Sequence, residues 1–373
     1  MGRKRIGFLV NPIAGMGGSV GLKGTDGDAY FKALELGAKP VAPLRARRFL
    51  NEVARLSLDV KAKFIIAPHV MGEDYAKDVL KDYEVVGYVP SRTTSARDTK
   101  NVVREFIEYG VDLVVFVGGD GTARDVVEIT GSQKPVLGVP SGVKVYSSVF
   151  AVNPEAAAKI VEAYINGTSI LVEGEVLDID EESFRRDELR IKLYGYALVP
   201  ALMEFIQPSK EPSPLLEDEI ENQRAIARYV IENLEPNTLY ILGPGTTVKA
   251  ITDELGLKKT LLGVDVLLNG KIVARDVSEK QLLELLNKYP KAKIIVTPIG
   301  GQGFIFGRGN QQISPNVIRR VGRENIIVVA TRRKLSKIHT LRVDTGDVNV
   351  DKLLKGYIRV IVDYNEEVVM KVT

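Results

Sequence analysis

Short apolar runs alternate with amphipathic segments through the first 167 residues of the chain. The apolar runs are rich in β-branched residues and lack polar alternation, as is typical of strands buried on both faces. The segments between them repeat apolar positions every three or four residues, which predicts helices at 29–36, 43–58, 73–83, 93–109, 124–130 and 154–166. The predicted strands are Arg5–Val10, Phe64–Ala67, Val85–Val89, Val114–Val117 and Pro135–Pro140. Strands that alternate with helices predict an open, mainly parallel, doubly wound sheet.

The pattern changes after Gly167. Ile170–Ile179 and Leu189–Leu198 alternate apolar and polar residues, which predicts two antiparallel strands. A helix at 218–234 and a strand at Thr238–Leu242 then begin a second α/β unit. We therefore expect two domains, a doubly wound α/β domain over 1–167 and a mixed α/β domain with antiparallel strands over 168–373. The proline-rich stretch at 207–217 is a candidate mobile loop in the second domain.

The strand at Val114–Val117 runs directly into the turn Gly118-Gly119-Asp120-Gly121-Thr122. A glycine turn between a strand and a helix presents unpaired backbone amides, which suit an anion. We expect Thr122 to cap a helix that begins at Ala123, with Asp125 in its first turn. Asp120 is unfavourable beside a phosphate unless it binds a metal ion or accepts a proton from an attacking hydroxyl. Both are roles in phosphoryl transfer, so Asp120 is the candidate catalytic residue.

Four more segments rich in glycine or small polar residues follow predicted strands. Residues 11–27 contain six glycines within positions 15–27, and 141–148 contain a lysine among small residues. Residues 243–249 repeat the glycine turn with two hydroxyls and a lysine, although a tight structural turn is an alternative there. Residues 300–312 concentrate hydrogen-bonding side chains. With the central turn, these segments supply the candidate ligand-binding residues Asn11, Pro12, Gly15, Gly17, Gly18, Lys23, Asp26, Gly118, Gly119, Gly121, Thr122, Lys144, Gly243, Gly245, Thr246, Thr247, Gln302, Arg308 and Asn310.

Other polar residues have plainer interpretations. Arg45, Arg47 and Arg48 are interpreted as a solvated helix face rather than a phosphate clamp. His69 is interpreted as an ordinary residue at the end of a strand. The spacing of Ser95 and Asp98 predicts a capping box at the start of a helix.

Composition limits the chemistry that the chain can perform. The 51 basic and 48 acidic residues give a net charge of +3, so no global field attracts nucleic acid or membrane. The chain contains no run of eighteen apolar residues, so no transmembrane helix is predicted. We expect a cytoplasmic protein. The absence of cysteine and the presence of only two histidines exclude thiolate chemistry and multi-histidine metal sites. Carboxylates, hydroxyls, lysine, arginine and backbone amides remain, with Mg²⁺ as a compatible metal.

The motifs Asn11-Pro-Ile-Ala-Gly15 and Gly118-Gly-Asp-Gly-Thr122 resemble those of the superfamily of NAD kinases, diacylglycerol-type lipid kinases and 6-phosphofructokinases. Further stretches are similar to the AcoX-type branch of predicted ATP–NAD kinases. They are 11–27, 118–126, 142–147, and 300–312 together with 243–247. The likeness therefore extends over nearly the whole chain.

This resemblance implies an NAD kinase/phosphofructokinase-like first domain that binds nucleotide. It implies transfer of a phosphoryl group from ATP, or another phosphate donor, to the 2′-hydroxyl of NAD or NADH, with Mg²⁺. In that scheme Asp120 orients or deprotonates the acceptor hydroxyl, and the glycine turn contacts the phosphates. The resemblance also implies that the protein forms a homo-oligomer and that it binds small-molecule nucleotides.

Two departures from that family leave the acceptor open. The Asn-Glu pair by which NAD kinases hold the NAD ribose and amide is not found where expected, because Ser141–Ser147 occupies that region. The second half also has an α/β rather than an all-β pattern. The alternatives are a kinase for another hydroxyl, on a lipid or a small metabolite, and a nucleotide-sensing protein without turnover.

Overall fold

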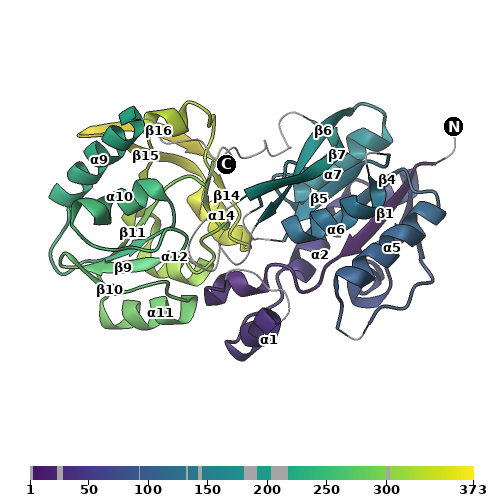
Figure 1. Ribbon diagram of the computed structural model, residues 1–373, viewed down its shortest axis with the longest axis horizontal. Helices are drawn as coiled ribbons and strands as arrows, with labels where there is room; N and C mark the ends of the chain where they lie inside the picture. Colours follow the sequence, from purple (N-terminus) through teal and green to yellow (C-terminus); the bar gives the residue numbers. More distant parts are fainter. Residues whose placement is uncertain are drawn as a thin grey trace.

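The computed structural model describes residues 3–22, 28–91, 93–131, 133–141, 145–179, 191–202, 217–299 and 303–373. Within these ranges the chain forms two α/β halves, which lie side by side along the longest axis of the molecule (Figure 1). Lys23, Asp26, Lys144 and Gln302 lie outside the described residues, as does most of the loop predicted at 207–217.

Among its described residues, the first half contains five parallel strands in the order β3-β2-β1-β4-β5. The first strands in the chain extend the sheet in one direction from β1, and the later ones extend it in the other. The loops that follow β1 and β4 therefore leave the sheet beside each other at its topological switch point. The strands are β1 (Arg5–Val10), β2 (Lys63–Ile66), β3 (Tyr83–Val85), β4 (Leu113–Gly118) and β5 (Val136–Pro140).

Helices cover both faces of this sheet. Phe8 of β1 stacks on Phe49 of α2 (Ala42–Arg55), with ring centroids 5.3 Å apart. The preceding residue, Gly7, lies under the ring of Phe106 from α5 (Ala96–Glu108). Neighbouring strand residues point to opposite faces, so α2 and α5 lie on opposite sides of the sheet. The remaining helical segments of this half are η1 (Met16–Val20), α1 (Asp28–Glu35), α3 (Leu58–Lys61), η2 (His69–Met71), α4 (Glu73–Ala76), α6 (Asp120–Thr130) and α7 (Pro154–Ile165).

An antiparallel hairpin, β6 (Ile170–Ile179) and β7 (Ile191–Ala201), follows the first sheet. The sequence pattern predicts this hairpin as part of the second domain. Its buried residues Val176, Ala197 and Val199 nevertheless belong to the hydrophobic core of the first half, and β6 packs along α6. The hairpin therefore supports the helix that begins at Asp120.

The second half contains a seven-stranded mixed sheet in the order β10-β9-β8-β11-β13-β15-β16. The strands β8, β11, β13 and β15 are parallel, and the others pair antiparallel. The strands of this sheet are β8 (Leu239–Leu242), β9 (Asp265–Leu268), β10 (Lys271–Ala274), β11 (Ala292–Val296), β13 (Ile326–Val329), β15 (Gly356–Asp363) and β16 (Glu366–Val372). The two sheets confirm the predicted fold class of a doubly wound parallel sheet followed by a mixed α/β unit.

The remaining elements of the second half pack on this sheet or connect it to the first. A short parallel pair joins β12 (Phe304–Phe306) to β14 (Arg342–Val343). The helical segments are α9 (Glu217–Glu232), α10 (Thr246–Glu254), α11 (Glu279–Lys288), α12 (Pro315–Val321), η4 (Arg323–Asn325), α13 (Arg332–Leu335) and α14 (Val348–Leu354).

Several predicted element boundaries are wrong. The helix predicted at 73–83 is only α4, and the third strand is β3 rather than Val85–Val89. Thr122 does not cap a helix, because α6 already begins at Asp120 with Gly119 at its N-cap position. The predicted capping box of Ser95 and Asp98 is confirmed.

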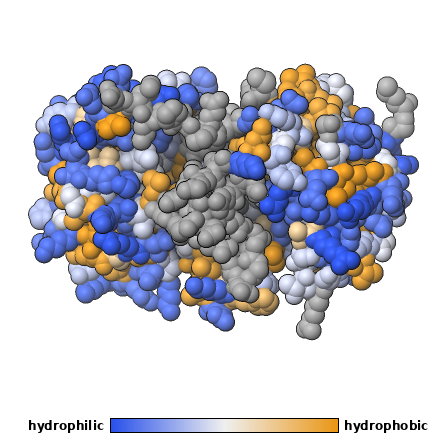
Figure 2. Space-filling model, viewed as in Figure 1, coloured by the Kyte–Doolittle hydropathy of each residue, from blue (hydrophilic) through white to orange (hydrophobic). Residues whose placement is uncertain are grey.

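Hydrophilic side chains cover much of both halves on the face shown in Figure 2, with apolar residues in smaller patches among them. Among the described residues, no helix is both long and apolar enough to cross a membrane.

Candidate functional site

The loop after β1 and the turn after β4 are joined by Asn11. Its backbone N–H donates to the carbonyl oxygen of Val117 at 2.9 Å, and its side-chain amide donates to the hydroxyl of Thr122 at 3.0 Å. Thr122 is thus used to hold the two loops together at the switch point. Two of the predicted binding segments therefore form one surface at the carboxyl edge of the first sheet.

Asp120 is the first residue of α6 and is only 7% exposed. Its carboxylate accepts hydrogen bonds from the backbone N–H of Tyr146 at 2.9 Å and of Ser147 at 2.8 Å. The Ser147 hydroxyl donates to the same carboxylate at 2.6 Å and accepts from the Leu177 N–H of β6 at 2.9 Å. The segment after β5 and the hairpin therefore fix the orientation of Asp120. Burial, with the Asp120 charge, raises the pKa of Tyr146, which keeps this phenol neutral at physiological pH.

The glycines of the first loop allow two close approaches. Gly15 has φ +81°, and a Cβ there would overlap the backbone carbonyl of Ser141, which follows β5. A Cβ on Gly18 would overlap the side-chain amide of Gln311 from the second half. The segments predicted at 11–27, 141–148 and 300–312 therefore meet where the two halves face each other.

A buried cluster of charges connects the halves beside this site. Arg45 of α2 donates to the carboxylate of Asp344, and Arg48 lies 3.3 Å from the same carboxylate. Arg308 lies 3.4 Å from it and also donates to the carbonyl of Val152. The interpretation of Arg45 and Arg48 as a solvated helix face is wrong, because Arg45 is 3% exposed and both contact Asp344.

The electrostatics of this cluster favour the ionised carboxylate. Burial alone would raise the pKa of Asp344, but Arg45, Arg308 and Arg48 outweigh that effect and hold this pKa well below its usual range. Burial lowers the pKa of Arg308 to about 10, with Asp344 opposing the shift, so its guanidinium stays charged at neutral pH.

Three buried polar atoms near this junction have no hydrogen-bond partner within the described part of the chain. They are Nε and Nη1 of Arg308, and Oγ of Ser141. Arg308 is 1% exposed, and its guanidinium lies 4.5 Å above the centre of the Phe304 ring. Buried donors without partners are costly, so this arrangement suits an anion that would accept from them.

The other predicted residues fall into three groups. Pro12 and Gly17 lie on the first loop and η1, and Gly118, Gly119 and Gly121 form the turn around Asp120. Asn310 is a structural residue, because its side-chain amide donates to Ile305 and accepts from Gly307. The remaining group follows β8 at the carboxyl edge of the second sheet and comprises Gly243, Gly245, Thr246 and Thr247.

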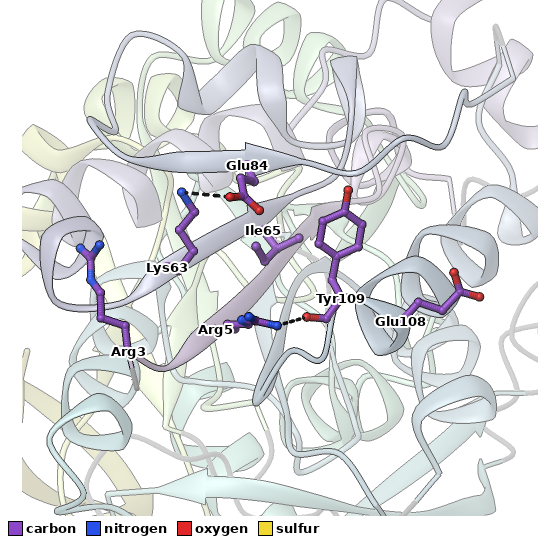
Figure 3. Close-up of a pocket in the computed structure, with 7 residues that line it drawn as sticks. All are labelled: Arg3, Arg5, Lys63, Ile65, Glu84, Glu108 and Tyr109. Carbon is purple, nitrogen blue, oxygen red and sulfur yellow. Dashed lines mark hydrogen bonds and ion pairs between the residues drawn. The ribbon is translucent and has the colours of Figure 1, made fainter. Parts of the chain in front are cut away.

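A cavity of about 710 Å³ lies at the opposite, amino-terminal edge of the first sheet. Three of its charged residues are already engaged, since Lys63 pairs with Glu84 and Arg5 donates to the carbonyl of Tyr109 (Figure 3). Its position away from Asp120 sets it apart from the candidate site. The cavity is lined by Arg3, Arg5, Lys63, Ile65, Glu84, Glu108 and Tyr109.

Sequence reasoning missed the partners of the candidate residues. Tyr146 and Ser147 bind Asp120 from a segment that drew attention for its small residues, its lysine and its position after a strand. Asp344 carried no local signal, because Arg45 lies 299 positions away from it in the chain. A buried carboxylate among arginines is recognisable only once the halves are packed together.

Comparison with known families assigns both halves of the chain. Residues 6–169 match the ATP-NAD kinase N-terminal domain, and residues 235–372 match the ATP-NAD kinase C-terminal domain. Comparisons with curated proteins and with solved structures find no match. The two family matches together cover well over half of the chain and include both sheets. Neither match distinguishes subtypes, so the AcoX-type subtype stays a prediction. The chain therefore belongs to the ATP-NAD kinase family and is a kinase.

Proposed function

We propose that the protein transfers a phosphoryl group from ATP, or from another phosphate donor, to the 2′-hydroxyl of NAD or NADH. The observation that carries this proposal is the placement of Asp120. This carboxylate is buried at the switch point of a nucleotide-binding type of sheet, and neighbouring donors fix its orientation. A fixed carboxylate in such a place suits the alignment of an acceptor hydroxyl.

In the proposed reaction, the acceptor hydroxyl donates a hydrogen bond to Asp120. Its oxygen bonds to the terminal phosphorus of the donor as the bond from that phosphorus to the bridging oxygen breaks, and ADP leaves. The hydroxyl proton passes to Asp120 and then to solvent. The first-turn amides of α6, within Gly118–Thr122, bind phosphate oxygens because a helix N-terminus favours negative charge. Arg308 and Ser141 are the further candidates to donate to phosphate.

Mg²⁺ is compatible with this site. Among the described residues, no cluster of three or more acidic or histidine side chains forms a dedicated metal cage. Mg²⁺ is commonly bound through one or two carboxylates together with substrate phosphates, so Asp120 and the donor phosphates are its candidate ligands. The ion would neutralise negative charge that develops on the transferred group.

The test is an assay of purified protein with ATP, Mg²⁺ and either NAD or NADH, with the phosphorylated dinucleotide as the readout. Asp120→Asn should lose on the order of 10²–10⁴-fold in kcat, because it removes the group that aligns and deprotonates the hydroxyl. Asp125→Asn is the matched control. Asp125 is also 7% exposed and lies on the same helix, but it pairs with Lys100 and Arg124. Circular dichroism should show both variants folded.

Each other outcome has a definite meaning. Near-normal activity of Asp120→Asn would reject its catalytic role. Transfer to a lipid or a small metabolite, but not to NAD or NADH, would replace the acceptor. ATP binding without transfer to any acceptor would identify a nucleotide sensor. The proposed homo-oligomer is checked separately by light scattering.

A further inference from the structure

The second sheet has a switch point of its own. In this sheet, β9 and β10 lie on one side of β8, and β11, β13 and β15, which come later in the chain, lie on the other side. The segments that follow β8 and β11 therefore diverge at the carboxyl edge, as those after β1 and β4 do in the first sheet. In open α/β sheets this is where ligands bind. The Asp120 site uses none of the residues that follow β8.

A glycine turn brings the start of α10 to this place. Gly245 has φ +115°, and a Cβ there would lie 2.8 Å from Cγ2 of Thr297, the residue after β11. Gly245 is the N-cap residue of this nine-residue helix, and no side chain caps it. The first-turn amides of α10 have no acceptor within the helix. By contrast, side-chain oxygens of Ser278, Ser314 and Thr331 cap neighbouring helices.

A buried hydroxyl lies in the first turn of the same helix. The Thr247 side chain is fully buried, and its Oγ1 has no hydrogen-bond partner within the described residues. Because Cα–Cβ bonds in a helix tilt toward its N-terminus, the Thr247 side chain leaves the backbone in the direction of the first-turn amides. A purely structural turn gives no reason to bury an unpaired hydroxyl there.

A cation and two further polar side chains adjoin the same turn. Lys334 of α13 donates to the Thr297 hydroxyl at 3.2 Å. The Gln223 amide, from α9, donates to the Thr246 hydroxyl at 3.3 Å. Glu219 packs near α13 and is engaged by Thr331 and Arg333, and Asp363 and Glu366 pair with Arg332 of the same helix. Helix amides, hydroxyls and an ammonium group together suit a phosphate.

We propose that the turn Gly243–Thr247, with Thr297 and Lys334, binds a phosphate group of a nucleotide at a second site, separate from the Asp120 turn. The first-turn amides of α10 and the Thr247 hydroxyl donate to the phosphate, and Lys334 supplies positive charge. The chain thus carries one phosphate-binding turn at the switch point of each sheet. This second site does not depend on which hydroxyl the kinase phosphorylates.

The test is isothermal titration of the full chain with inorganic pyrophosphate and with ATP. Thr247→Val preserves the shape of the side chain and removes the hydroxyl. This substitution should lower the affinity of one class of binding sites for pyrophosphate and ATP by about tenfold or more, because one hydrogen bond to a charged group is lost. Without ligand its Tm should be unchanged or raised, because no hydrogen bond is lost. Asp120→Asn should retain this class of sites, which separates the result from any failure of the kinase assay.

Thr252→Val is the matched control on the same helix. Thr252 is also fully buried, but its hydroxyl donates to the carbonyl of Lys249 at 2.7 Å. This variant should lower Tm and leave binding unchanged. Lys334→Met, at a half-buried position, should weaken the same class of sites and reduce its salt dependence. Wild-type affinity and stoichiometry in both Thr247→Val and Lys334→Met would overturn the proposal.

Discussion

The buried Asp344 carboxylate faces three guanidinium groups, and those of Arg45 and Arg308 are buried with it. Two of these arginines belong to the first half and one to the second, so a single acid neutralises charge from both. Buried ion pairs are expensive to assemble and still more expensive to break, since the remaining partner keeps an uncompensated charge. Asp344 is therefore a residue on which the junction depends.

Asp344→Asn should destabilise the protein by about 3–5 kcal/mol, the usual cost of breaking a buried pair. Glu155→Gln is the control, since Glu155 binds Arg48 with 37% of its side chain exposed. Because this pair is more accessible to solvent, its loss should cost less, about 1 kcal/mol. Urea unfolding at neutral pH measures both changes. Equal effects of the two variants would contradict the role of Asp344.

The pH dependence of stability follows from the same residue. The folded-state pKa of Asp344 is depressed, so its contribution is fully present above the unfolded value of about 3.9 and is lost as pH falls toward the folded value. The wild-type Tm should fall as pH is lowered below about 4, and Asp344→Asn should show a lower Tm with a flatter acid limb. A scan of Tm from pH 7 to pH 3 checks this, and parallel curves would count against it.

Among the structural elements, the loop after β1 needs glycine for two different reasons, which are positive φ angles and close packing against a neighbouring segment. Gly15 and Gly21 both have positive φ, +81° and +78°. A Cβ on Gly15 would overlap the Ser141 carbonyl, whereas the nearest atom to a Cβ on Gly21 would be 3.7 Å away. The two positions therefore separate backbone strain from close packing.

Gly15→Ala should lower both Tm and ATP affinity, because the loop must move away from the segment after β5. Gly21→Ala should show only the backbone strain, on the order of 1 kcal/mol. Thermal unfolding and ATP titration of the two variants make the comparison. A similar loss in both would mean that strain alone explains the glycines.

At the scale of the whole molecule, β12 belongs to two cores at once. Phe304 packs in the hydrophobic core of the first half, although it comes from the second part of the chain. Phe306, two residues later on the same strand, packs in the core of the second half. Both side chains are buried, so one short strand couples the stability of the two halves.

Phe304→Ala and Phe306→Ala should each cost about 3–5 kcal/mol, as is usual for a truncated core phenylalanine. The two variants should, however, destabilise different parts of the molecule. Hydrogen exchange should accelerate mainly in β1 and β4 for Phe304→Ala, and mainly in β8 and β11 for Phe306→Ala. The same exchange pattern in both variants would show that the cores do not divide at this strand.

Much of the fold was predictable because its signals are local. Buried parallel strands such as Val114–Val117 are continuous apolar runs, and the glycine turns stand directly after them. Boundaries were less predictable, since the first turn of a helix depends on what its polar residues contact. Thr122 is a residue type that often caps helices, and it precedes a helical pattern. Its hydroxyl nevertheless accepts a hydrogen bond from Asn11, and the helix begins at Asp120.

Local sequence patterns are sufficient to predict the two α/β units, the strand–turn–helix that carries Asp120 and the phosphoryl-transfer chemistry that such a turn favours. Which polar groups come into contact depends on how the chain folds. Folding brings Tyr146 and Ser147 to Asp120 and makes Arg45, predicted to be solvated, a buried partner of Asp344. Among the described residues, it also leaves the hydroxyls of Ser141 and Thr247 and two nitrogens of the Arg308 guanidinium buried without hydrogen-bond partners. The physical reason is that periodicity and turn chemistry act over a few residues, whereas burial and charge pairing depend on segments hundreds of positions apart.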